Sequence, residues 1–155
     1  MLQWLSATPV SRWARESDYG FYILLTGHAI GMALVVGIIF VLGFRLLGLS
    51  KDEPLAAFDK LFIVAWLGFL LNLGTGLALL GANGEHLIRN PAFLLKIGFI
   101  VMGGVAVRAL GRSMKTEPDS HAASGARTRV IAILTMMLWT LAIIAGRWIA
   151  YTPEF

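Results

Sequence analysis

Hydrophobic positions gather in four long blocks along the chain, and polar positions gather between them. A helix needs about 20 mostly apolar residues to cross roughly 30 Å of hydrocarbon, and each block is long enough. The blocks cover residues 21–44, 61–82, 91–109 and 130–151. The pattern therefore predicts an all-α fold, a four-helix transmembrane bundle with up-down topology.

Short polar sequences mark the ends of these spans. Asn90–Pro91 offers a side-chain cap followed by proline at the first helical position of the third span. Asn83–Gly84 is a turn signal after the second span, and Ser50 with Glu53 resembles a capping box before it. The segment from Arg112 to Arg129 has no apolar periodicity, so we expect a mobile loop there.

Residues 1–20 form a separate segment in front of the transmembrane domain, which covers residues 21–155. Trp4, Leu5 and Trp13 occur there among polar residues, as in a short amphipathic piece that lies at a membrane interface. The first span is longer than the apolar region of a signal peptide, which has about 7–15 residues. We therefore expect it to be retained.

The composition excludes several kinds of site. Hydrophobic residues make up 57% of the chain and charged residues 14%, whereas about a quarter of a soluble domain is charged. The absence of cysteine excludes disulfides, iron–sulfur clusters and cysteine nucleophiles. The net charge of +4 comes from basic residues scattered around the apolar blocks, so we expect no nucleic-acid partner.

The basic residues also predict an orientation. Of the 13 Lys and Arg residues, eight flank the first and third loops, and five lie toward the termini and the second loop. Because cytoplasmic loops carry the excess of Lys and Arg, the first and third loops are predicted to be cytoplasmic. Both termini are then periplasmic in a protein of the bacterial inner membrane.

His28, Lys96 and Arg147 are ionisable side chains within the spans, where such a group costs about 2.5–3.5 kcal/mol at the bilayer centre. His28, Lys96 and Arg147 are roughly 10, 7.5 and 6 Å from the same predicted membrane surface, at 1.5 Å per residue. Helical phase places His28 on the same face as Gly31. Asn72 lies near the middle of the second span, and it shares a helix face with other small and polar residues. We therefore predict a polar pocket in the outer third of the bundle.

Simpler interpretations exist for the same residues. Lys96 and Arg147 are close enough to the surface to snorkel, with their charged ends among the head groups. His28 can be a neutral histidine that is hydrogen-bonded to a neighbouring helix, and Asn72 with Thr75 can hydrogen-bond between helices.

The first functional hypothesis is a haem b site in a membrane redox or electron-transfer accessory protein. Haem iron in electron-transfer proteins takes histidine or methionine as axial ligand. His28 is the first candidate ligand, and His86 or Met32 is the second. The cations that would pair with the haem propionates are Lys96, Arg89 and Arg147.

Other hypotheses stay open beside this one. Copper handling would use His28 and Met32, which lie one turn apart on one helical face. The chain could also be a structural subunit without a cofactor, or it could recognise an anionic lipid or quinone head through its cations. The acidic residues all lie outside the spans, and no phosphate-binding loop or zinc motif occurs, so we do not expect an enzyme by itself. Expected partners are the lipid bilayer and either other membrane redox subunits or a second copy of the chain.

Several strings resemble an uncharacterised family of bacterial four-helix membrane proteins, and the resemblance covers nearly the whole chain. They are Arg15-Glu16-Ser17, His28 with Gly31, Arg45-Leu46-Leu47-Gly48-Leu49, Asn90-Pro91-Ala92-Phe93 with Lys96, and Gly146-Arg147-Trp148-Ile149-Ala150-Tyr151. That family commonly has an acidic residue before the Arg-Leu-Leu-Gly string, where this chain has Gly43–Phe44. More distantly, the architecture is similar to CopD copper-resistance and cytochrome b561-like membrane proteins. The resemblance implies a haem or copper function.

Overall fold

The computed structural model describes residues 3–49, 59–115 and 124–152, with the backbone alone at Asp59, Asn83, Glu85, His86 and Lys115. The regular elements of these residues are all helices, as the sequence predicts. They are α1 (Gln3–Ser6), α2 (Pro9–Glu16), α3 (Gly20–Leu47), α4 (Asp59–Leu87), α5 (Pro91–Lys115), α6 (Ala126–Trp148) and the short 3-10 helix η2 (Ile149–Tyr151).

Four segments are long and apolar enough to cross a membrane: Gly20–Leu47, Lys60–Ala82, Pro91–Met114 and Ala126–Tyr151. In the most apolar part of α4 and of α5, 11% of the residues are buried, against 39% in α3. Most of the apolar surface of α4 and α5 therefore faces outward. Length, composition and exposure together indicate a membrane protein whose helices contact the lipid bilayer.

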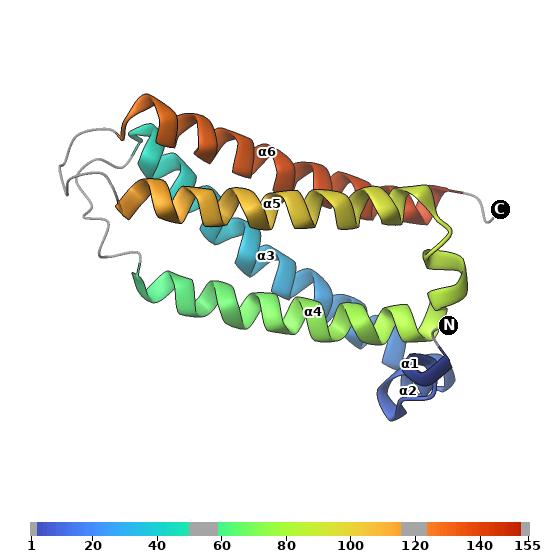
Figure 1. Cartoon of the computed structure of the whole chain (residues 1–155). Coiled ribbons are helices and arrows are strands. Elements are labelled where there is room, and N and C mark those ends of the chain that lie inside the picture. Colours follow the sequence, from blue (N-terminus) through green and yellow to red (C-terminus); the bar gives the residue numbers. More distant parts are fainter. Residues whose placement is uncertain (1–2, 50–58, 116–123, 153–155) are drawn as a thin grey trace.

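The bundle consists of two helix pairs, with α3 at its centre. Helix α3 packs along α4, α5 packs along α6, and the contact between α3 and α6 joins the two pairs (Figure 1). Both pairs are antiparallel. In α3 and α4, Gly27 lies against Thr75 and Gly31 against Gly68. In α5 and α6, Lys96 lies against Gly146 and Ser113 contacts Thr128.

One end of the bundle carries α1, α2, the turn between α4 and α5, and η2, and we call it the terminal end (Figure 1). The other end has an apolar core of Leu42, Leu46, Leu110 and Ala132. A second, smaller core lies at the terminal end and comprises Ala14, Leu24 and Ala78. The polar residues of the candidate site lie between these two clusters in sequence and along the helices.

The N-terminal segment is helical and is attached to α4. Thr8 caps α2 by accepting a hydrogen bond from the Ser11 backbone at 3.3 Å, and Pro9 follows at the first helical position. Ser11 is fully buried, whereas Arg12 and Glu16 on the other side of α2 are exposed. This distribution agrees with an amphipathic helix. Its location at a membrane interface stays a prediction.

The helix limits differ from the sequence predictions at three places. The turn predicted at Asn83–Gly84 is wrong, because α4 continues to Leu87 and turns at Ile88–Arg89. Gly84 is buried, and Leu5 of α1 packs against Gly81, one turn earlier on α4, so tertiary packing overrides the local turn preference here.

The predicted loop from Arg112 to Arg129 is also too long, because α5 extends to Lys115 and α6 begins at Ala126. The proposed capping box of Ser50 and Glu53 lies outside the described residues. The predicted cap at Asn90 is confirmed: its Oδ1 accepts hydrogen bonds from the backbone of Ala92 at 2.9 Å and of Phe93 at 3.4 Å.

The third difference is at the end of α3, which continues to Leu47 instead of residue 44. Arg45 therefore lies in the last turn of this helix, with 2% of its surface exposed. Gly48 follows with a φ of 95° and ends the helix in a left-handed conformation that favours glycine.

Candidate functional site

His28 lies where α3 and α4 come closest. A Cβ atom placed on Gly31 would be 2.7 Å from both the Gly68 carbonyl oxygen and the Asn72 backbone nitrogen. On the other side of His28, a Cβ atom on Gly27 would be 3.3 Å from the Thr75 methyl group. The absence of side chains at these glycines lets the two backbones approach and brings His28 against the polar face of α4. This confirms the prediction that the small and polar residues of α3 and α4 point into the bundle.

Hydrogen bonds orient the imidazole of His28. Its Nδ1 lies 3.0 Å from the Asn72 carbonyl oxygen and 3.3 Å from the Thr75 hydroxyl, and Asn72 Nδ2 donates to the His28 carbonyl at 2.7 Å. A carbonyl can only accept, so Nδ1 is the protonated nitrogen in this contact. In the neutral ring, Nε2 then carries a lone pair that is directed away from α4.

Lys96 of α5 meets that lone pair. Its Nζ lies 3.3 Å from His28 Nε2, so the ammonium donates to the imidazole. The lysine stem passes over Gly146 of α6, where an added Cβ would be 3.3 Å from Lys96 Cδ. The predicted convergence of His28 and Lys96 is therefore confirmed. We call this pair the His28–Lys96 site.

Among the side chains that the structure describes, the site contains a cation but no carboxylate. Glu16 and Asp18, the acidic residues whose side chains the structure describes, both precede α3 in the chain. Within the described ranges, no ion pair involves Lys96, and its polar contact is the one with His28. Both residues are half-buried. The ammonium has three N–H donors, so two stay available to an electron-rich group.

Arg147 and Arg89 are not brought into the site. Arg147 lies in the last turn of α6, directly after Gly146, but its side chain is exposed. Arg89 is exposed in the turn between α4 and α5. Across the described part of the chain, no hydrogen bond connects either arginine with His28 or Lys96.

The two proposed second ligands are placed differently. Met32 is half-buried on α3, one turn after His28. His86 lies in the helical part of α4 near its end, but its side chain is outside the described atoms. Among the residues searched, no group of three or more His, Cys, Asp or Glu side chains could hold a metal ion.

Two glycines complete the site. An added Cβ on Gly76 would be 3.0 Å from His28 Cε1, so this glycine leaves room for the imidazole. Gly76 lies one turn after Asn72, on the face that helical phase predicts to be small and polar, whereas the position of Gly146 beneath Lys96 was not predicted. A glycine next to an intramembrane arginine was the available signal.

The chain matches no protein-family model, no curated protein and no solved structure in the comparisons made. The resemblance to an uncharacterised family and to CopD or cytochrome b561-like proteins therefore stays a prediction. The function has to be argued from the His28–Lys96 site itself.

Proposed function

We propose that this chain is a multi-pass protein of the bacterial inner membrane that binds an amphiphile with an anionic head group at the His28–Lys96 site. In this proposal the bundle has up-down topology, and its terminal end faces the periplasm together with both termini. The single observation that carries the proposal is the contact of Lys96 Nζ with an imidazole nitrogen at 3.3 Å, while no carboxylate among the described side chains pairs with it.

The electrostatic argument begins with the cost of a cation within a span, about 2.5–3.5 kcal/mol on insertion scales. Burying such a charge favours a partner of opposite sign. His28 accepts one hydrogen bond from Lys96 but has no negative charge in its neutral form. A carboxylate or phosphate head would supply that charge and accept the remaining N–H groups of Lys96.

The position of the ammonium group argues against simple snorkelling. A snorkelling lysine extends its charged end to the head groups. In this chain the stem lies against Gly146 and the ammonium faces His28, so helices α3, α5 and α6 together position it. The imidazole is fixed by Asn72 on its other side, which gives the cation a defined direction.

The haem b and copper hypotheses stay predictions. Metal-bound histidine commonly donates its second N–H to a carbonyl, and the contact of His28 with Asn72 has that form. However, Lys96 stands at Nε2, where a metal ion would bind, and the residues searched offer no group of metal ligands. The donor set therefore fits an anion better than iron or copper, and we derive no redox step.

A fluorescent fatty acid and its methyl ester test the proposal directly. Both are titrated into the purified protein in detergent micelles, with protein-free micelles as the blank. We expect the acid to bind about tenfold more tightly than the ester, because a charge-assisted hydrogen bond contributes ~1.5 kcal/mol or more. Lys96→Met should abolish this preference, and Lys96→Arg should keep part of it.

Arg147→Met provides the matched control, because it removes an exposed cation from the same end of the bundle without touching the site. It should leave the preference for the acid unchanged. Equal binding of acid and ester by the wild-type protein contradicts the proposal, as does an equal loss in Arg147→Met. An absorption spectrum with a haem band that disappears in His28→Ala would replace the proposal with the haem hypothesis.

A further inference from the structure

Helix α2 is attached to the side of α4 and not to its end. Ser11 Oγ donates to the Ala78 carbonyl at 3.3 Å, and Arg15 Nη1 donates to the Gly81 carbonyl at 3.0 Å. Both carbonyls lie within the segment Lys60–Ala82, which is apolar enough to span a membrane. Ala78 is roughly 13 Å before the end of α4 at 1.5 Å per residue.

This attachment leaves the opposite face of α2 directed away from the bundle, near the end of the apolar segment Lys60–Ala82. Ser11 and Ala14 on the attached face are buried, with 0% and 4% of their surfaces exposed. Figure 1 shows α1 and α2 beside the terminal ends of α3 and α4 (Figure 1). In the membrane arrangement proposed above, a surface at the end of a spanning segment lies beside phospholipid head groups.

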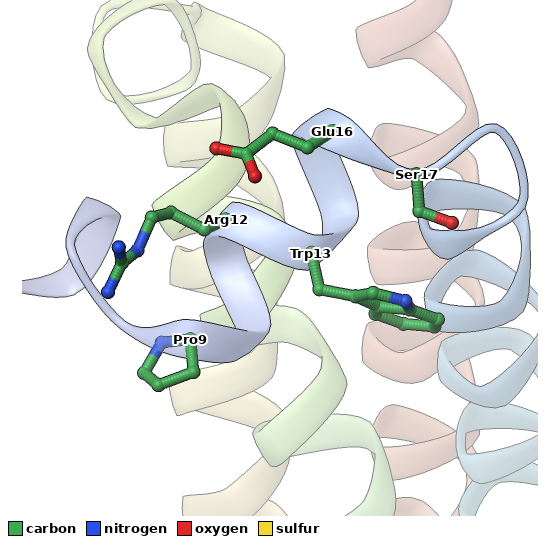
Figure 2. A pocket seen from close by; sticks show the side chains of 5 residues that line it. All are labelled: Pro9, Arg12, Trp13, Glu16 and Ser17. Atoms are coloured by element: carbon green, nitrogen blue, oxygen red, sulfur yellow. The ribbon is translucent and has the colours of Figure 1, made fainter.

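That outward face contains a shallow hollow of about 420 Å³. It is lined by Pro9, Arg12, Trp13, Glu16 and Ser17 (Figure 2). The spacing of these residues puts them on one face of a helix. In Figure 2, Arg12 and Glu16 extend to one side of α2 and the Trp13 indole extends to the other.

The two charges of the hollow do not neutralise each other. Arg12 and Glu16 are one turn apart and exposed, and in the described part of the chain no ion pair joins them. Arg12 offers a planar guanidinium that matches a phosphate, and Glu16 offers a carboxylate one turn further along. Trp13, with 42% of its surface exposed, has the amphipathic ring that is enriched at membrane interfaces.

We propose that this hollow binds the head group of a phospholipid that carries both a phosphate and a primary ammonium group. Arg12 binds the phosphate, Glu16 accepts hydrogen bonds from the ammonium, and the Trp13 indole lies along the upper part of the lipid. A choline head has the same charges but no N–H donor, and a glycerol head has no cation. This inference is independent of the His28–Lys96 site.

Native mass spectrometry of the detergent-purified protein tests the inference with three lipids of identical acyl chains. Phosphatidylethanolamine should be retained about fivefold better than phosphatidylcholine or phosphatidylglycerol. Arg12→Ala should lower the retention of all three lipids. Glu16→Gln should remove the preference for phosphatidylethanolamine and keep phosphate-dependent binding, and Glu16→Asp should keep the preference.

Two variants at the same end of the bundle serve as controls. Asp18→Asn removes an exposed carboxylate two residues from Glu16, and Arg89→Ala removes an exposed guanidinium outside the hollow. Neither should change the ratio between the lipids. Equal retention of the three lipids by the wild-type protein overturns the inference. A loss of preference in Asp18→Asn as large as in Glu16→Gln overturns it as well.

Discussion

The close approach of α3 and α4 makes Gly31→Ala a sharp test of the packing that holds His28 in place. The new methyl carbon would lie 2.7 Å from the Gly68 carbonyl oxygen and from the Asn72 backbone nitrogen. Ordinary contacts begin near 3.4 Å, so it is about 0.7 Å too close to two backbone atoms that no side-chain rotation can move. The two helices have to separate, which weakens the hydrogen bonds between His28 and Asn72.

We expect Gly31→Ala to destabilise the protein by about 1–3 kcal/mol, as overpacking does in well-packed cores. Gly37→Ala is the matched control, because it lies on the same helix and its added Cβ meets nothing within 4 Å. That variant should be neutral, or more stable by up to about 1 kcal/mol through helix propensity. The melting temperatures of the two variants are measured by heating the protein in detergent and detecting the remaining folded protein by size-exclusion chromatography. Equal melting temperatures for Gly31→Ala and Gly37→Ala would refute the close approach.

Two further predictions concern contacts of α4. Asn72→Leu removes the donor to the His28 carbonyl. It should lower the free energy of unfolding by ~0.6–1.7 kcal/mol, the range measured for hydrogen bonds between membrane helices. An unchanged unfolding temperature would contradict this. Arg15→Met removes the hydrogen bond to the Gly81 carbonyl. Trypsin should therefore cut the N-terminal segment at Arg12 faster than in the wild-type protein. The control variant Asp18→Asn should leave the cleavage rate unchanged.

Hydrophobic patterning and helical phase predict much of the fold, and they predict that His28 points into the bundle. Four apolar blocks can only satisfy their backbone polar groups in a membrane as helices or closed barrels, and their length indicates helices. The small and polar positions on one face of each helix predict that His28 and Asn72 point into the bundle, but they do not predict the contact between these two residues. The depth of Lys96 along α5 predicts its level in the bundle correctly.

Depth does not predict the direction of a side chain, and this is why the sequence could not show that Arg147 is exposed on α6. Neighbouring helical residues point about 100° apart. Helix α6 presents Gly146 to the Lys96 stem, so the next residue points outward. The rotation of α6 depends on its packing against α3 and α5, which no single segment of the sequence contains. The end of α4 was missed for a similar reason, because α1 packs on α4 through Leu5, which lies against Gly81.

The central claim is that a cation from α5 donates to the Nε2 atom of an imidazole that α4 orients through Nδ1. Nitrogen-15 NMR of the imidazole tests it, using a protein in which His28 is the single histidine after His86→Asn and His121→Asn. The account predicts the neutral form protonated at Nδ1, with an Nε2 resonance that shifts in Lys96→Met while the Nδ1 resonance stays nearly constant. A ring protonated at Nε2, or an Nε2 resonance indifferent to Lys96→Met, would contradict it.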